Sequence, residues 1–171
     1  MRLPVIFLLV MSCGFSQLGA AQPTAMNSTP VWNFLCERYA FGGVLDVQVS
    51  KTNKGGQLRL AVESATLATS QIAGTTYLFL KNNSSITCTD KNKHSVEGTK
   101  IISYYDLTAT EMYQLQQSNI DYIHFNIKGK STSFSSQMGN FTAINKRSYF
   151  GKDTPEKPNY FTTALACKAL N

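Results

Sequence analysis

Two stretches of alternating apolar and polar residues, separated by a short polar loop, constrain the fold of this chain most. The apolar positions are Leu45, Val47 and Val49 before the loop, and Leu58, Leu60 and Val62 after it. The loop, residues 51–56, ends in two glycines. A period of two on both sides of a glycine-containing loop is typical of a β-hairpin, so we expect two antiparallel strands here.

Most of the remaining chain is also strand-like. We expect strands at residues 75–81, 85–89, 99–106, 121–128 and 141–150, with the aromatic and apolar segment 75–81 as a buried strand. Polar residues 90–98 and 129–140 are expected to form loops, the second alternatively a weak hairpin.

Two segments carry helix signals. Thr108 and Glu111 have the spacing of a capping box, which predicts a short central helix from that point. The apolar spacing in residues 160–170 predicts a C-terminal helix. The fold class that follows is mainly β (α+β): an antiparallel sheet or sandwich with these two helices at its edge.

The N-terminus has the layout of a secretory signal peptide. A basic start at Arg2 precedes a short apolar run and a small-residue stretch that ends at Ala21. The apolar run is shorter than the roughly 20 residues that cross a bilayer. We therefore expect residues 1–21 to be a signal peptide, 22–32 a flexible arm and 33–171 a single β-rich domain that is secreted or periplasmic.

Residues 10–14 support a second mode of export. The sequence Val-Met-Ser-Cys-Gly is similar to a lipobox, in which Cys13 is lipidated and becomes the new N-terminus. The small, polar residues 14–30 would then be a flexible tether to the cell envelope. Plain secretion and lipid anchoring through Cys13 both remain open.

Composition excludes several classes of protein. With 43% hydrophobic residues in 171, the chain is too apolar to be disordered. Its net charge of +6 comes from lysines scattered over the predicted turns, whereas nucleic-acid modules concentrate their charge on one face. We therefore expect no nucleic-acid partner.

The order of elements resembles that of small exported bacterial β-rich proteins. Residues 77–167 contain a strand that leads into Leu107-Thr108 and a capped helix, then a strand at 120–125, and end near Cys167. The resemblance covers about half of the chain and agrees with the expected fold. No activity is attached to that group, so it implies nothing about function.

The three cysteines beyond the leader suggest a structural role. In an exported protein we expect one disulfide among Cys36, Cys88 and Cys167, and the sequence leaves the pairing open. There is no C-x-x-C motif that would indicate a redox thiol. His94 lies in a polar loop and is expected to be solvated, and the two histidines lack the partners of a zinc site.

No catalytic motif is present, and the sequence predicts no catalytic residue, metal or cofactor. The polar face of the strand at 121–128 carries Tyr122, His124 and Asn126, which together form a candidate ligand surface. We expect an exported, non-enzymatic binding or interaction module for a protein, glycan or envelope ligand. The alternative is a small secreted enzyme or enzyme inhibitor, and a concave pocket on which His124, Asp121 or an unpaired cysteine converge would favour the enzyme.

Overall fold

The computed structural model of the protein describes residues 27–37, 43–129 and 138–170. These residues form ten strands and two helices. In chain order they are β1 (Trp32–Cys36), β2 (Val44–Thr52), β3 (Gly55–Glu63), β4 (Ser70–Ile72), β5 (Thr76–Leu80), β6 (Ser85–Cys88), β7 (His94–Glu97), β8 (Lys100–Thr108), α1 (Ala109–Gln117), β9 (Ile120–Gly129), β10 (Gly139–Ile144) and α2 (Thr163–Lys168).

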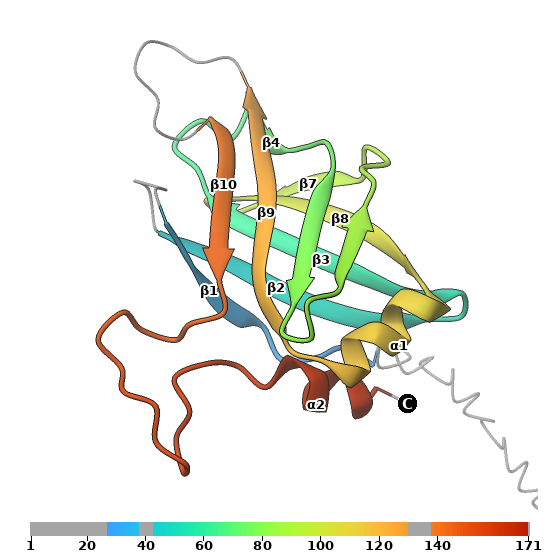
Figure 1. The fold of residues 1–171 in the computed structure, drawn as a ribbon. Coiled ribbons are helices and arrows are strands. Elements are labelled where there is room, and N and C mark those ends of the chain that lie inside the picture. Colours follow the sequence, from blue (N-terminus) through green and yellow to red (C-terminus); the bar gives the residue numbers. More distant parts are fainter. Residues whose placement is uncertain (1–26, 38–42, 130–137, 171) are drawn as a thin grey trace, which may run out of the picture.

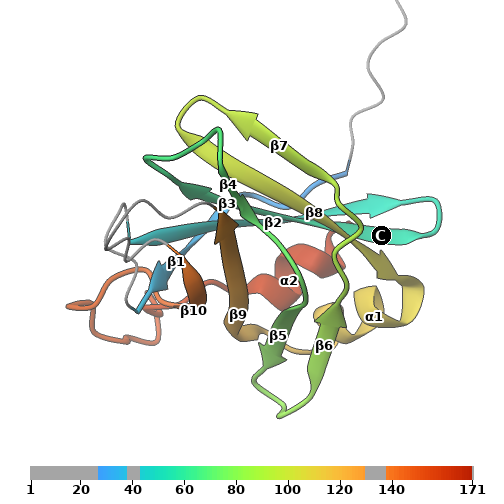
Figure 2. The same ribbon diagram turned by 90° about the horizontal axis from the view of Figure 1, so that it is seen from above.

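All ten strands of the described residues belong to one antiparallel sheet. Its order is β6-β5-β9-β10-β1-β2-β3-β8-β7, and the short β4 pairs with β9 beside β5. The sheet curls, so that β5, β9 and β10 lie opposite β2 and β3, with the two helices at one end (Figures 1 and 2). The predicted class is confirmed, as a single curled sheet rather than a two-sheet sandwich.

The predicted hairpin is confirmed as β2 and β3. Their ladder runs from Leu45 opposite Val62 to Thr52 opposite Gly55, which leaves a two-residue connection. The glycines that follow the turn serve close packing. A Cβ atom on Gly55 would overlap backbone atoms of Leu107 and Thr108, and one on Gly56 would displace the Met112 side chain, so the two glycines let β3 approach the end of β8 and α1 closely.

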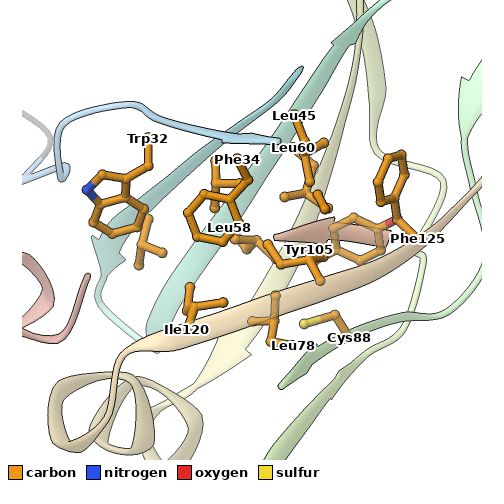
Figure 3. Packing of buried hydrophobic residues seen from close by; sticks show 14 of the residues in the cluster. Trp32, Phe34, Leu45, Leu58, Leu60, Leu78, Cys88, Tyr105, Ile120 and Phe125 are labelled. Atoms are coloured by element: carbon orange, nitrogen blue, oxygen red, sulfur yellow. The ribbon is translucent and has the colours of Figure 1, made fainter. Parts of the chain in front are cut away.

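One core fills the inside of the curled sheet. Inward side chains alternate along each strand, as period-two patterning requires. Figure 3 shows residues of β1, β2, β3 and β8 facing residues of β5 and β9 across this core: Trp32, Phe34, Leu45, Leu58, Leu60 and Tyr105 on one side, Leu78, Ile120 and Phe125 on the other.

The chain is part of the fold before β1 begins. Lys51 donates its backbone N–H to Asn27, and Thr29 donates its own to Val49, so this segment pairs with β2. Trp32 is buried at the start of β1. The described part of the arm predicted for residues 22–32 therefore lies against the sheet, and strand β1 was missed because its alternating pattern is only five residues long.

Of the two described helices, only the central one begins at a capping box, because Thr162 at the start of α2 makes no side-chain cap. Thr108 caps α1, accepting from the Glu111 N–H, while the Glu111 carboxylate accepts from the Thr108 N–H at 2.7 Å. The capping box is thereby confirmed. The shorter α2 starts beside Asn119, whose side-chain oxygen accepts from the Ala164 N–H.

Strand β10 is shorter than the predicted strand at 141–150 because Asn145 ends it. This buried amide donates to the carbonyls of Ile120 and Phe161 and accepts from the Phe161 N–H, which joins three segments. Tyr149 and Phe150 consequently lie in a loop outside the sheet. Phe150 is 96% exposed there.

Candidate functional site

The three residues of the predicted ligand surface share the outer face of β9. Ile123, Phe125 and Ile127 point into the core, so Tyr122, His124 and Asn126 point away from it. This arrangement follows from the alternation of the strand.

Strand β5 adds two aromatic side chains that the sequence analysis assigned to a buried strand. Only one side of β5 is buried: Tyr77 is 41% exposed and Phe79 is partly exposed, while the residues between them face the core. Tyr77 lies opposite His124, and Phe79 opposite Tyr122. The alternation of Tyr77 and Phe79 with Thr76, Leu78 and Leu80 was the signal available in the sequence.

Tyr77, Phe79, Tyr122 and His124 form what we call the aromatic cluster. The ring centroids of Phe79 and Tyr122 are 4.5 Å apart and nearly parallel, and Phe79 meets the His124 ring edge-on at 4.9 Å. Such ring pairs add about 0.5–1.5 kcal/mol beyond area burial. The packing holds the rings in fixed positions on the surface.

Two hollows open on either side of His124, each of about 330 Å³. The first is lined by Thr75, Tyr77, His124, Phe125, Asn140, Phe141 and Thr142. The second is lined by Glu37, Asp121, Tyr122, His124, Thr142 and Ile144. Because His124 and Thr142 line both, one ligand can occupy the two hollows together.

The two hollows differ in charge. Apart from His124, the first has only aromatic, hydroxyl and amide groups in its wall, with Asn140 held by a 2.7 Å hydrogen bond from Asn126. Asn126 thus belongs to the site as a support for Asn140. The second hollow carries two carboxylates, those of Glu37 and Asp121.

A local irregularity aims Asp121 at the second hollow. Phe79 pairs with Tyr122, but the next residue of β5, Leu80, pairs with Ile120, so β9 contains one extra residue. A bulge of this kind redirects a side chain, and bulges are frequent beside functional sites. It brings Asp121 into the same hollow as Tyr122 and His124.

The cysteines do not supply a nucleophile to this face. Cys36, Cys88 and Cys167 are free and buried, on β1, β6 and α2, so the structure does not bear out the predicted disulfide. Burial raises the pKa of each thiol to about 12, and for Cys88 the Glu111 carboxylate adds to the effect. At neutral pH all three are therefore uncharged and poorly nucleophilic.

His94 lies elsewhere in the molecule, and its predicted solvation is wrong. Residues 94–97 form β7 on β8, which places the half-buried His94 opposite Ser103. The His94 Nδ1 atom is 2.7 Å from the Ser103 hydroxyl, and its Nε2 atom is 3.4 Å from Asp90. This order resembles a catalytic triad, but Ser103 is buried and its hydroxyl donates to the Ile72 carbonyl, so it is a structural link.

A third hollow, between the β2–β3 turn and β8, has three lysines in its wall: Lys54, Lys91 and Lys93. Asp106 lies among them, with its carboxylate 2.7 Å from Lys93 and 3.4 Å from Lys91. The hydrogen bond from Lys93, followed by that from Lys91, lowers the pKa of the Asp106 carboxyl. This carboxylate pairs with two of the three lysines, so the wall of the hollow keeps a net positive charge.

Other site types find no support in the part of the chain that the structure describes. No group of three potential metal ligands occurs among those residues. Neither described helix has the length and apolarity needed to span a membrane. Cys13 and the predicted signal peptide lie outside the described residues.

Searches of protein-family models, of curated proteins and of solved structures find no match to this chain.

Proposed function

We propose that the protein is an exported, non-enzymatic binding module that holds its ligand on the outer face of β5, β9 and β10. The observation that carries this proposal is the pair of hollows joined at His124 and Thr142, beside the ordered aromatic cluster. Binding sites are commonly concave, partly aromatic and supplied with a few fixed polar groups. The signal-like N-terminus is the basis for export, with lipid anchoring through Cys13 as the alternative.

A direct test displays the purified protein to a glycan array and a peptide array. We expect specific binding that Tyr77→Ala and His124→Ala each reduce at least tenfold. Tyr113→Ala is the matched control, because Tyr113 is 61% exposed on α1, away from the cluster. Binding that all three variants retain equally would place the ligand elsewhere and refute the proposal.

Cell fractionation tests the localisation. Wild-type protein is expected outside the cytoplasm and shortened at its N-terminus. Labelling with radioactive palmitate separates the two modes of export, because only a lipid-anchored protein would incorporate label that is lost in Cys13→Ser.

A small secreted enzyme is the second candidate, since His124, Asp121 and Glu37 line one hollow. Carboxylates and an imidazole are the groups that general acid–base catalysis uses. The test is hydrolysis of a panel of glycosides and esters by wild-type protein and by Asp121→Asn. Turnover that this substitution abolishes would favour the enzyme over the binding module.

A further inference from the structure

The second hollow differs from the first in carrying two carboxylates, neither of which has a partner in the part of the chain that the structure describes. The structure gives neither Glu37 nor Asp121 a side-chain hydrogen bond or ion pair among the described residues. Lys81, the residue after β5, does not line the hollow, and its ammonium group lies 3.9 Å from the centre of the Tyr160 ring. On a protein of net charge +6, two acids without a partner among the described residues make this hollow locally negative.

The walls of the hollow add an aromatic element. Tyr122 and His124 line it together with the two acids. A positively charged group is attracted both by carboxylates and by aromatic rings, and an arginine or lysine side chain gains from both. A neutral group would leave the carboxylates desolvated without compensation.

We propose that the ligand is a partner protein's extended basic segment, in which an arginine or lysine side chain enters the hollow between Glu37 and Asp121. This inference rests on the proposed function and names the ligand of that site. An apolar or aromatic residue two positions away would then enter the first hollow, beside Tyr77.

The spacing of the two hollows agrees with an extended segment. Tyr77, His124 and Thr142 lie side by side on β5, β9 and β10, and Glu37 continues this row where its N–H bonds to the Thr142 carbonyl. The hollows lie on opposite sides of this row along the strands: the first includes Thr75 and Asn140, and the second Tyr122 and Ile144, each two residues from the row. Alternate residues of a strand are about 7 Å apart, and so are side chains two positions apart on an extended peptide that lies parallel to the strands. Two such side chains therefore reach both sides of His124.

The stacking of the rings also favours a peptide over a flat sugar. Phe79 and Tyr122 present their faces to each other, with an angle of 15° between their planes. Those inner faces are unavailable to a sugar ring, whereas ring edges and hydroxyl groups suit the side chains of a protein partner.

The experiment titrates the ¹⁵N-labelled protein with the peptide acetyl-Gly-Phe-Gly-Arg-Gly-amide. Its control is the same peptide with citrulline, the neutral isostere of arginine. We expect amide shifts at residues 121–124 and 142, at least tenfold weaker binding of the citrulline peptide, and weaker binding of the arginine peptide as salt rises. These comparisons use wild-type protein, so they do not depend on any variant folding.

Variants then assign the effect to the two acids. Glu37→Gln and Asp121→Asn should each weaken the arginine peptide at least fivefold and leave the citrulline peptide unchanged. Glu156→Gln, an exposed acid in the loop after β10, should change neither.

Equal binding of both peptides, still lost in Tyr77→Ala, would overturn the basic-segment proposal and leave the binding module standing. The same conclusion would follow if a neutral glycan were the sole ligand found on the arrays and its binding were lost in Tyr77→Ala and His124→Ala. If Tyr77→Ala and His124→Ala both still bind the peptide and the glycan as tightly as wild type does, the binding module itself is refuted.

Discussion

The outer face of β2, β3 and β8 and the outer face of β5, β9 and β10 belong to one sheet but use their side chains differently. On the first, charged groups are paired: Lys100 lies 2.5 Å from Asp46, which also accepts from Asn33, and Arg59 lies 3.0 Å from Glu97. On the second, aromatic rings contact one another around an exposed His124, and two acids face a hollow.

The charged side chains of the first face are therefore satisfied by one another, whereas those of the second face are available to a ligand. The Asp46 side chain is only 11% exposed, although Asp46 points away from the core, because Lys100 and Asn33 cover it. Paired charges leave little free energy for a ligand to gain. An aromatic surface beside carboxylates that have no partner among the described residues has that capacity, and four experiments follow from this contrast.

The largest effect should come from alkaline pH, which acts on the core beneath both faces. The pKa values of Cys36, Cys88 and Cys167 rise from 9.0 to about 12, and that of Tyr105 from 10.0 to about 12, chiefly through burial. Between about pH 9 and 12 the unfolded chain therefore holds fewer protons than the folded one, so stability falls as pH rises. Each group contributes about 1.4 kcal/mol per pH unit within that window.

Urea unfolding at pH 8, 9, 10 and 11 measures this loss. Cys88→Ala should be less stable than wild type at pH 8, yet lose stability less steeply above pH 9, because one of the titrating groups is gone. Parallel pH profiles for the two proteins would show that the native thiol at position 88 ionises as freely as an unfolded one.

The next largest effect should be on the charge-paired face. Asp46→Ala leaves Lys100 and Asn33 without their carboxylate, and hydrogen bonds to charged groups are worth about 1.5–3 kcal/mol. We expect the free energy of unfolding at pH 7 to fall by about 2 kcal/mol, because the exposed Asn33 and the 36% exposed Lys100 side chain recover part of the loss in water.

His124→Ala is the matched substitution on the other face. His124 is exposed, and its ring contacts among the described residues are with Phe79 and Tyr122 of the cluster, so its removal should cost less than about 1 kcal/mol. If Asp46→Ala and His124→Ala lowered the free energy of unfolding equally, the two faces would not differ in how far their side chains stabilise the fold.

A substitution at Ser103 tests the contact between β8 and β4, where the two ends of the curled sheet lie against each other. Its buried hydroxyl joins β8 to the Ile72 carbonyl of β4, and His94 contacts the same oxygen. Ser103→Ala leaves both groups unpaired, and we expect a loss of about 1–2 kcal/mol, with faster hydrogen exchange in β4.

Ser95→Ala on the adjacent strand is the control, since its buried hydroxyl has no hydrogen-bond partner among the described residues. That substitution should be neutral or stabilising. A larger loss in Ser95→Ala than in Ser103→Ala would show that the two ends are joined elsewhere.

Whether a feature could be predicted from the sequence depends on how far apart in the chain the interacting residues are. The hairpin, the capping box of Thr108 and the outward direction of Tyr122 and His124 depend on neighbours within a few residues, and all were predicted. The exposed side of β5 was not separated from the buried side, because Tyr77 and Phe79 are aromatic like many core residues, although they alternate with Leu78 and Leu80.

The parts that could not be predicted depend on pairing between distant segments. The aromatic cluster forms because β5 pairs with β9, which brings Tyr77 beside His124 across 47 positions of sequence. The hollow at Asp121 also requires the one-residue bulge in β9, which no local sequence pattern predicts. His94 became half-buried because a polar four-residue segment pairs with β8, and polarity alone predicted a loop.

The smallest effect should come from Glu97→Gln, which tests how far the contrast depends on exposed charge. The Arg59–Glu97 pair is close, but the Glu97 side chain is 60% exposed, and ion pairs in contact with water contribute about 0–1 kcal/mol. We expect a loss below about 0.5 kcal/mol at low salt, measured by urea unfolding, and none at 1 M NaCl, where the screening length is about 3 Å. The comparison with Asp46→Ala is informative because both substitutions remove one carboxylate from the same face and differ mainly in burial. If Glu97→Gln cost as much as Asp46→Ala, the stability of this face would reside in its net charge rather than in the covered contacts of Asp46.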